Sequence, residues 1–270
     1  MRVQLQNDTS AELFTEQLLD IGNGKMVTHT STQLITMPPT FCTTTASRSQ
    51  LIQKVFPHLT QNYTSHKWLS ELAILAATNN DVHMINYSIQ NEIPGETTTY
   101  KSIDTVMNQD EVVHYPTEFL NSLDLPGMPR HDLTLKIGVP IILLRNINLP
   151  RLCNGTRLAV KKLIKNIIKA TILNGKYKGA DVLLPRIPMI PTDMPFEFKR
   201  LQFPIRLAFA MTINKAQGQS LQVCGIDLEN PCFSHGQLYV TCSRVGKPSD
   251  LFMFIPNGKT KNIVYPQALL

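Results

Sequence analysis

The chain has 270 residues, of which 43% are hydrophobic and 17% charged, and its formal net charge is +6. Enough apolar side chains are present to form a core, which excludes a disordered chain. No charged-then-apolar leader and no apolar run of about 18 residues occurs, which argues against secretion and membrane insertion.

The first 114 residues alternate helical and strand-like patterns. Apolar residues at three- and four-residue spacing predict a helix over 10–20, capped by Ser10 and ended by Gly22–Gly24, with an inner face of Leu13, Phe14, Gln17 and Leu18. Residues 26–46 predict a loop or a short β excursion. A second helix is expected over 47–59, ending near Pro57.

The next segments predict a strand, a turn and a helix. Leu72–Ala76 is a short apolar run, Thr78–Asp81 a polar turn, and Val82–Gln90 a helix with inward apolar positions. Residues 97–106 alternate weakly and begin with β-branched side chains, which predicts one strand.

Residues 115–203 differ from their surroundings by their prolines and strand-like runs. Asn154-Gly155 and Asn174-Gly175 predict turns between these runs, which span Leu133–Asn146, Thr156–Lys162, Ile167–Leu173 and Gly179–Ile187. Several short strands at this spacing predict a small barrel. Because the strand–helix pattern resumes from Pro204, this block is interpreted as an inserted subdomain.

The most informative segments are LAFAMTINKAQGQSL (Leu207–Leu221) and QLYVTCSRVGK (Gln237–Lys247). The first predicts a strand, a turn at Thr212–Asn214 and a helix opening over Lys215–Ser220. The second carries Arg244 at the end of an apolar stretch. Glycine admits close backbone approach, helix-start N–H groups attract anions, and a guanidinium forks onto phosphate oxygens. The pattern therefore favours contact with nucleotide phosphate and a nucleic-acid backbone.

Together these segments resemble the last two motifs of PIF-type superfamily 1 helicases, relatives of RecD and of Helitron helicases. Three further stretches follow in the family's order: MRVQLQND (Met1–Asp8), AILAATNNDVHMIN (Ala73–Asn86), and LKIGVPIILLRNIN with LCNGTRL (135–158). The resemblance implies a RecA-like α/β second motor domain, of the P-loop NTPase type with a parallel sheet. It divides the chain into 1–114 and 204–270 of that domain, with an SH3-like β subdomain over 115–203.

The resemblance also implies roles for individual residues. Arg244 matches the arginine finger that stabilises charge on the transferring phosphoryl group. Arg2, Gln217 and Gly218 match positions near the γ-phosphate. The implied contacts with single-stranded DNA come from Thr78, Asn79, Asn80, Thr212, Asn214 and Lys215. A helix cap is the alternative for Thr78–Asn80 and for Thr212–Gly218, a surface position for Arg244, and terminal fraying for Arg2.

The phosphate loop and the acidic metal pair of the family's first RecA-like domain do not occur in this sequence. Gly258-Lys259-Thr260 has Met253 where G-x-x-x-x-G-K-S/T needs glycine, and Met26 follows Gly24-Lys25. No apolar strand ends in Asp-Glu. ATP and Mg²⁺ would therefore be held mainly by a separate or missing N-terminal RecA-like domain, and the chain is predicted to be inactive alone.

The resulting hypothesis is the C-terminal portion of an ATP-dependent 5′→3′ DNA helicase that grips single-stranded DNA. The alternative is a non-catalytic single-stranded DNA-binding remnant of a helicase or transposon gene. Met1 coincides with a methionine internal to the family pattern, so an artefactual start codon is a further expectation. Nuclear residence is expected, with mitochondria as the alternative, and the family association extends to DNA repair, recombination and telomere maintenance.

The remaining polar and aromatic residues have ordinary alternatives. Five cysteines without C-x-x-C or zinc-finger spacing predict reduced thiols and no metal site. Trp68 is expected to pack in the core or at its rim, and His83 to lie on a helix surface. A solvated face or a DNA-backbone track both suit the lysines at positions 161, 162, 165, 169, 176 and 178.

Overall fold

The computed structural model describes residues 9–108, 114–191, 194–265 and 267. The chain forms two compact units. Unit 1 comprises residues 1–62, 67–92 and 209–270, and unit 2 comprises residues 63–66 and 93–208. The main segment of the second unit therefore runs from Ile93 to Ala208. The domain bounds expected at 115 and 203 stay a prediction.

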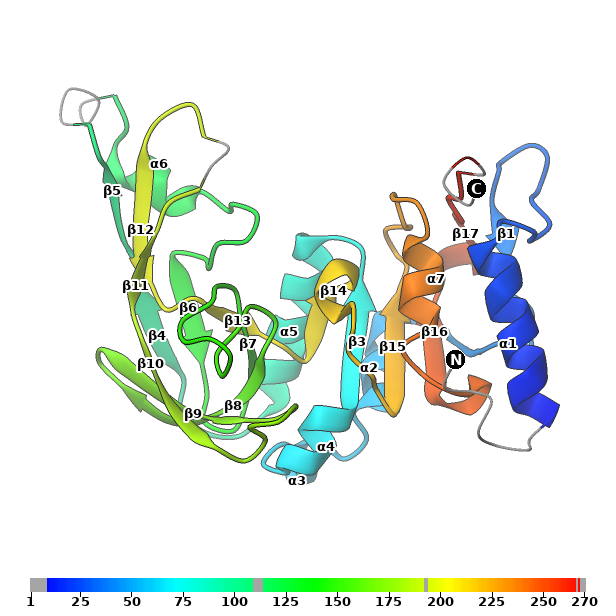
Figure 1. Cartoon of the computed structure of the whole chain (residues 1–270), viewed down its shortest axis with the longest axis horizontal. Coiled ribbons are helices and arrows are strands. Elements are labelled where there is room, and N and C mark those ends of the chain that lie inside the picture. The colour runs from blue at the N-terminus through cyan, green and yellow to red at the C-terminus, as the bar shows by residue number, and fades with distance from the viewer. Residues whose placement is uncertain (1–8, 109–113, 192–193, 266, 268–270) are drawn as a thin grey trace. The chain divides into compact units, whose positions relative to one another are not determined.

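Unit 1 is built from strands and helices that alternate along the chain (Figure 1). Its strands are β1 (Ile35–Thr36), β2 (Thr43–Thr45), β3 (Leu72–Ala76), β14 (Ala210–Thr212), β15 (Val223–Asp227), β16 (Leu251–Phe254) and β17 (Lys259–Thr260). Its helices are α1 (Thr9–Gly22), α2 (Arg48–Val55), α3 (Leu59–Asn62), α5 (Asn79–Glu92) and α7 (Gln237–Cys242), with α4 (His66–Glu71) starting at the boundary. Among its described residues, this unit also contains the 3₁₀ turns η3 (Ile213–Ala216), η4 (Pro248–Asp250) and η5 (Pro256–Gly258).

A five-stranded parallel sheet forms the centre of unit 1. Its order is β14-β3-β15-β16-β2, and every neighbouring pair runs parallel. All five residues of β3 are buried, as expected for a strand covered by helices on both faces. The expected RecA-like parallel sheet is thus confirmed, and the predicted bounds of the strand at 72–76 are correct.

Two close contacts fix helices on this sheet. A Cβ on Gly225 of β15 would lie 2.6 Å from Val55 Cγ2 of α2, so only glycine lets α2 approach this far. On α5, Asn86 donates its amide to Ala210 O (2.8 Å) and accepts from Ala210 N (2.9 Å). Because β14 is an edge strand, this side chain satisfies backbone groups that no neighbouring strand reaches.

Unit 2 consists mainly of antiparallel strands. Its sheets have the orders β10-β9-β8-β7-β13, β11-β12-β5 and β4-β6. These strands and the helix α6 (Thr117–Ser122) are β4 (Thr98–Lys101), β5 (Ile103–Val106), β6 (Asp132–Leu135), β7 (Pro140–Leu143), β8 (Arg157–Ile164), β9 (Ile167–Ile172), β10 (Asp181–Pro185), β11 (Ile187–Met189), β12 (Phe198–Gln202) and β13 (Ile205–Leu207). The SH3-like character expected of this block stays a prediction.

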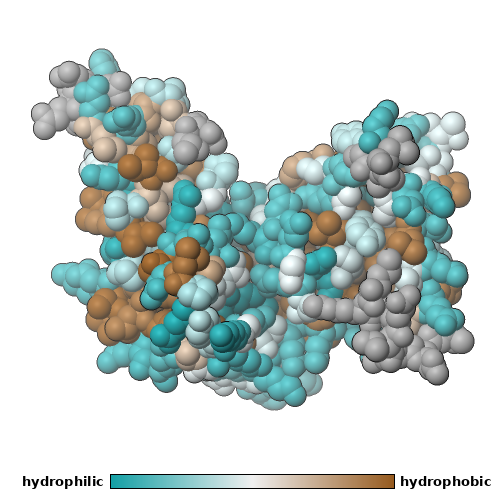
Figure 2. Space-filling view, in the orientation of Figure 1, coloured by the Kyte–Doolittle hydropathy of each residue, from teal (hydrophilic) through white to brown (hydrophobic). Residues whose placement is uncertain are grey.

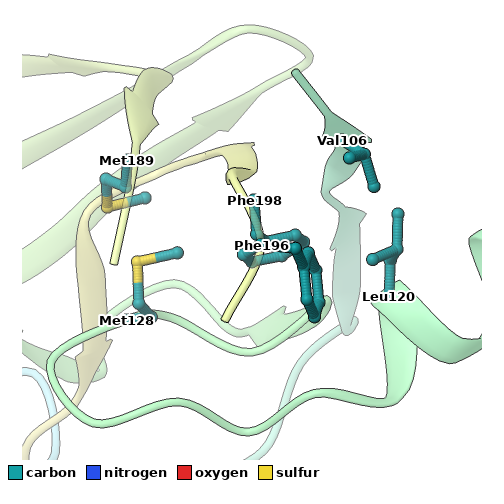
Figure 3. Close-up of a cluster of buried hydrophobic side chains, with 6 residues drawn as sticks. All are labelled: Val106, Leu120, Met128, Met189, Phe196 and Phe198. Carbon is teal, nitrogen blue, oxygen red and sulfur yellow. The ribbon is translucent and has the colours of Figure 1, made fainter. Parts of the chain in front are cut away.

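A fully buried ion pair links two strands of the three-stranded sheet of unit 2, and the arginine of this pair also bonds to the segments that cover the sheet. Arg200 of β12 binds both oxygens of Asp104 of β5, with its shortest contact at 2.7 Å. Its remaining N–H groups donate to the carbonyls of Leu120, Leu123 and Pro129. Figure 3 shows the neighbouring apolar cluster, which consists of Val106, Leu120, Met128, Met189, Phe196 and Phe198.

Several expected elements need correction. No α-helix opens at Lys215: only the 3₁₀ turn η3 forms, because Gln217 is extended (ψ 130°) and Gly218 has φ +79°. The strand expected over 97–106 is two strands, β4 and β5, in different sheets. The run 133–146 likewise divides into β6 and β7, with Gly138 at φ +89° between them.

Smaller corrections concern the N-terminal segments. The helix α1 already includes Ser10, which therefore lies within it rather than before it. Leu13, expected to face inward, is 44% exposed, whereas Phe14 and Leu18 are buried. The excursion expected over 26–46 contains β2, which is an edge strand of the central sheet.

Candidate functional site

The turn Thr78–Asp81 lies at the carboxyl end of β3, where ligands commonly bind in open α/β sheets. The helix α5 begins at Asn79, so Asn79 and Asn80 occupy its first turn, and both are exposed. Thr78 Oγ1 donates to Asp81 Oδ2 (2.6 Å) and accepts from Asp81 N (3.2 Å). Thr78 therefore caps α5, and its contact with DNA stays a prediction.

The second predicted DNA segment lies beside the first. Thr212, the last residue of β14, pairs in register with Ala76 of β3. The next residues form η3, in which Asn214 is exposed and Lys215 half-buried. Because β3 and β14 are parallel neighbours, both predicted turns emerge from the same edge of the sheet.

Arg244 lies against the loop that contains Gln217 and Gly218. Its Nη1 donates to the carbonyls of Ala216 and Gln219, each at 3.3 Å. Its Nε donates to Val240 O at 2.7 Å and its Nη2 to Ser243 Oγ at 2.6 Å. The guanidinium therefore joins the end of α7 to the loop after β14, and Gln217 and Gly218 are exposed on that loop.

Arg2 lies outside the described residues, so the structure gives it no position. Within the described ranges, no group of three or more His, Cys, Asp or Glu side chains is arranged to hold a metal ion. The same ranges contain no helix that is both long and apolar enough to cross a bilayer.

An ionic network beside the first turn is not anticipated by the sequence patterns. Arg48, the first residue of α2, contacts Asp227 Oδ2 (2.5 Å), Asp81 Oδ1 (3.0 Å) and Glu229 Oε2 (2.6 Å). Asn230 also donates to Asp81 Oδ2 at 2.8 Å. Burial acts to lower the pKa of Arg48, but the bond to Asp227 and the charges of Asp227, Glu229 and Asp81 raise it above its ordinary value.

Sequence spacing gives little sign of this network. Asp227 and Glu229 stand out only as single acids after an apolar strand, and Arg48 looks like any helix-starting residue. The contacts join α2, α5 and β15, which are far apart in the chain. The one signal in the sequence that could have indicated this network is a polar side chain directly after each strand of a parallel sheet.

The six lysines of the β block are partly neutralised. Lys161 and Lys169 both contact Asp181, at 2.7 and 3.1 Å. Hydrogen bonds from Lys161, Thr171 and Lys169 hold the pKa of Asp181 well below its ordinary range. Figure 2 shows apolar surface over the strands of unit 2 and a mainly hydrophilic face on unit 1. The question of a solvated face or a DNA track stays open for these lysines.

Comparisons with known proteins agree with this fold. The family model for the 2B domain of the DNA helicase Pif1 matches residues 118–163. ATP-dependent DNA helicase Pif1 of Campylobacter jejuni is 32% identical over 134 residues, covering 46% of this chain and 29% of that protein. ATP-dependent DNA helicase PIF6 of Trypanosoma brucei brucei is 27% identical over 175 residues, covering 55% and 22%. The chain thus spans about a quarter of these relatives.

Solved structures show the same similarity. Pif1 helicase from Candida albicans superposes with a TM-score of 0.63 at 21% identity, covering 96% of this chain and 56% of that one. Pif1 from Bacteroides in complex with ADP-AlF3 and ssDNA gives 0.61 at 21% identity, covering 98% and 53%. At these identities the match establishes the Pif1-type fold with its central parallel sheet.

Proposed function

We propose that the chain is the C-terminal part of a PIF-type superfamily 1 helicase and acts as the second motor domain of an ATP-driven, 5′→3′ DNA helicase. The observation that carries the proposal is the shared edge of β3 and β14, from which Asn79, Asn80, Asn214 and Lys215 emerge. The related Bacteroides Pif1 has been solved with bound ssDNA.

We assign the strand-gripping role to these two neighbouring turns. Amide side chains and backbone N–H groups bind phosphate oxygens without reading sequence, and a lysine adds attraction to the polyanion. Thr78 contributes by fixing the start of α5, because its hydroxyl already bonds to Asp81. This grip predicts salt-sensitive binding with little base preference.

Arg244 is assigned to the phosphoryl-transfer site formed with a separate N-terminal RecA-like domain. Its two longest bonds, to Ala216 O and Gln219 O, are the ones it can release to reach a phosphate. The exposed Gln217 and Gly218 beside it suit the same anionic group. Mg²⁺ and most of the ATP contacts belong to the other domain in this proposal, and the nucleotide supplies the phosphoryl group.

The enzymatic test mixes the purified chain with the first RecA-like domain of a matched relative. We expect DNA-stimulated ATP hydrolysis that Arg244→Ala lowers by about 10³-fold or more. Lys247→Ala is the control, because Lys247 is exposed and pairs only loosely with Asp250 (3.7 Å). Background activity in the mixture, unchanged by Arg244→Ala, would contradict the motor assignment.

The alternative is a non-catalytic module that binds single-stranded DNA. The hydrogen bonds of Arg244 favour this alternative. Its Nε, Nη1 and Nη2 all donate to groups of the same unit rather than pointing toward a separate domain. It predicts binding to oligothymidine, weakened about tenfold by joint replacement of Asn79 and Lys215 with alanine, without any ATPase in the mixture. Unchanged binding in the double variant would refute the grip itself.

A further inference from the structure

The ionic network around Arg48 connects three elements at the carboxyl edge of the central sheet. Arg48 starts α2, Asp81 lies in the first turn of α5, and Asp227 ends β15. A cation at the start of a helix is unfavourable next to the helix dipole. The carboxylates of Asp81 and Asp227, which are 7% and 0% exposed, offset that cost. In return, the guanidinium of Arg48 compensates the negative charges that these two side chains bury.

Asp81 connects the ionic network to the Thr78–Asn80 turn through its side chain and its backbone N–H. Its Oδ1 accepts from Arg48, and its Oδ2 accepts from both Thr78 Oγ1 and Asn230 Nδ2. Its own backbone N–H donates to Thr78 Oγ1. The carboxylate thus holds the cap of α5 from one side, while Arg48 and Asn230 hold the carboxylate from the other.

A direct phosphate-binding role for Arg48 disagrees with its surroundings. Its Nε and Nη2 already donate to carboxylates, and one guanidinium faces the three carboxylates of Asp81, Asp227 and Glu229. The group is therefore net negative, and it repels phosphate rather than attracting it. Its contribution to DNA binding has to come through geometry.

We propose that Arg48 and Asp81 are positioning residues that fix the Thr78–Asn80 turn in the conformation that receives the phosphates of a single strand. The inference rests on the proposed DNA grip and deepens it. It makes a prediction opposite in sign to simple electrostatics, because removing the negative charge of Asp81 should weaken the binding of a polyanion.

The test compares Asp81→Asn with Asp250→Asn by fluorescence anisotropy of fluorescein-labelled oligothymidine, at a temperature where both variants are folded. Both substitutions remove one carboxylate from unit 1, but the carboxylate of Asp250 contacts Lys247 (3.7 Å) and Ser249 Oγ (3.2 Å), at η4 rather than at a predicted DNA turn. We expect Asp81→Asn to raise Kd about fivefold to tenfold, and Asp250→Asn to leave it unchanged or lower it. Equal or tighter binding by Asp81→Asn would overturn the proposal.

Arg48→Lys provides the second variant, because it keeps the charge but cannot fork across two carboxylates. In Asp81→Asn and in Arg48→Lys, amide hydrogen exchange should speed up at residue 81 and Val82, while Ile89 and Gln90 keep their protection. Coupling to Asn79→Ala separates positioning from general destabilisation: once Asn79 is absent, Arg48→Lys should have a smaller effect on Kd. Full additivity refutes the inference alone, whereas absent binding by the unaltered chain refutes the DNA grip and the inference together.

Discussion

Removing the buried guanidinium of Arg200 should destabilise unit 2 more than any other single polar substitution in its three-stranded sheet. Arg200 and Asp104 both have fully buried side chains, and Asp104 also accepts from Ser102 Oγ at 2.6 Å. Arg200→Ala removes the guanidinium that forks onto that carboxylate and takes a donor from three backbone carbonyls, of which Leu120 O keeps the N–H of Leu123. Breaking a buried pair from one side costs about 3–5 kcal/mol, and the carbonyls place the expected loss towards the upper end of that range.

This loss is measured by urea denaturation, with the unfolding of unit 2 monitored through hydrogen exchange in β5 and β12. The fluorescence of Trp68 reports the unfolding of unit 1 as an internal control. Trp68 lies in unit 1, where it packs against Phe56 at 5.6 Å, so its fluorescence transition should shift less. Arg200→Met combined with Asp104→Leu should recover most of the loss, because neither charge is then buried. If Arg200→Ala lowers the free energy of unfolding by less than about 1 kcal/mol, the buried pair does not hold the three-stranded sheet to the segments that cover it.

Three further predictions concern the central sheet and the thiols. Gly225→Ala should cost about 1–3 kcal/mol in denaturation, because its Cβ would lie 2.6 Å from Val55 Cγ2; Gly246→Ala, with open space around it, is the matched control, and equal midpoints would contradict the close packing of α2. Asn86→Ala should cost about 1–3 kcal/mol and speed exchange at Ala210 N–H, because two bonds to the edge strand are lost; unchanged exchange would show that another group satisfies β14. Burial raises the pKa of the Cys42, Cys224 and Cys232 thiols to about 12 and that of Cys242 well above its ordinary value, so at pH 8 they stay protonated and iodoacetamide should label Cys153 first; mass-spectrometric detection of early labelling at Cys224 would disprove this.

Local patterns were informative wherever neighbours in the chain decide the conformation. The strand at 72–76 was predicted with correct bounds, because five consecutive apolar residues between polar turns suit a strand covered on both faces. Glycine also marked the connections at 155 and 175, where φ is +88° and +81°. The same glycine signal explains one error, since Gly218 stops the helix expected from Lys215.

Position within the sheet was beyond the reach of local patterns. Thr43–Thr45 has no apolar alternation, yet it is an edge strand because the exposed edge of β16 pairs with it. The segment 97–106 reads as one strand, but Ser102 divides it where its two halves join different partners. Long-range pairing decides both cases, and one sequence alone does not encode which distant strand is available.

The sequence by itself determined the class of sheet and the segments that emerge at its carboxyl edge, because each of these segments is a short apolar run followed directly by Thr, Asn, Lys or Gly. Tertiary structure alone decided how these residues work together. It brought Arg48 to Asp81 and Asp227 across 33 and 179 positions of the chain, and it turned Arg244 toward the loop of Gln217 and Gly218. Charges meet in this way only after the helices and strands have packed, because a desolvated ion pair forms where burial forces its partners together.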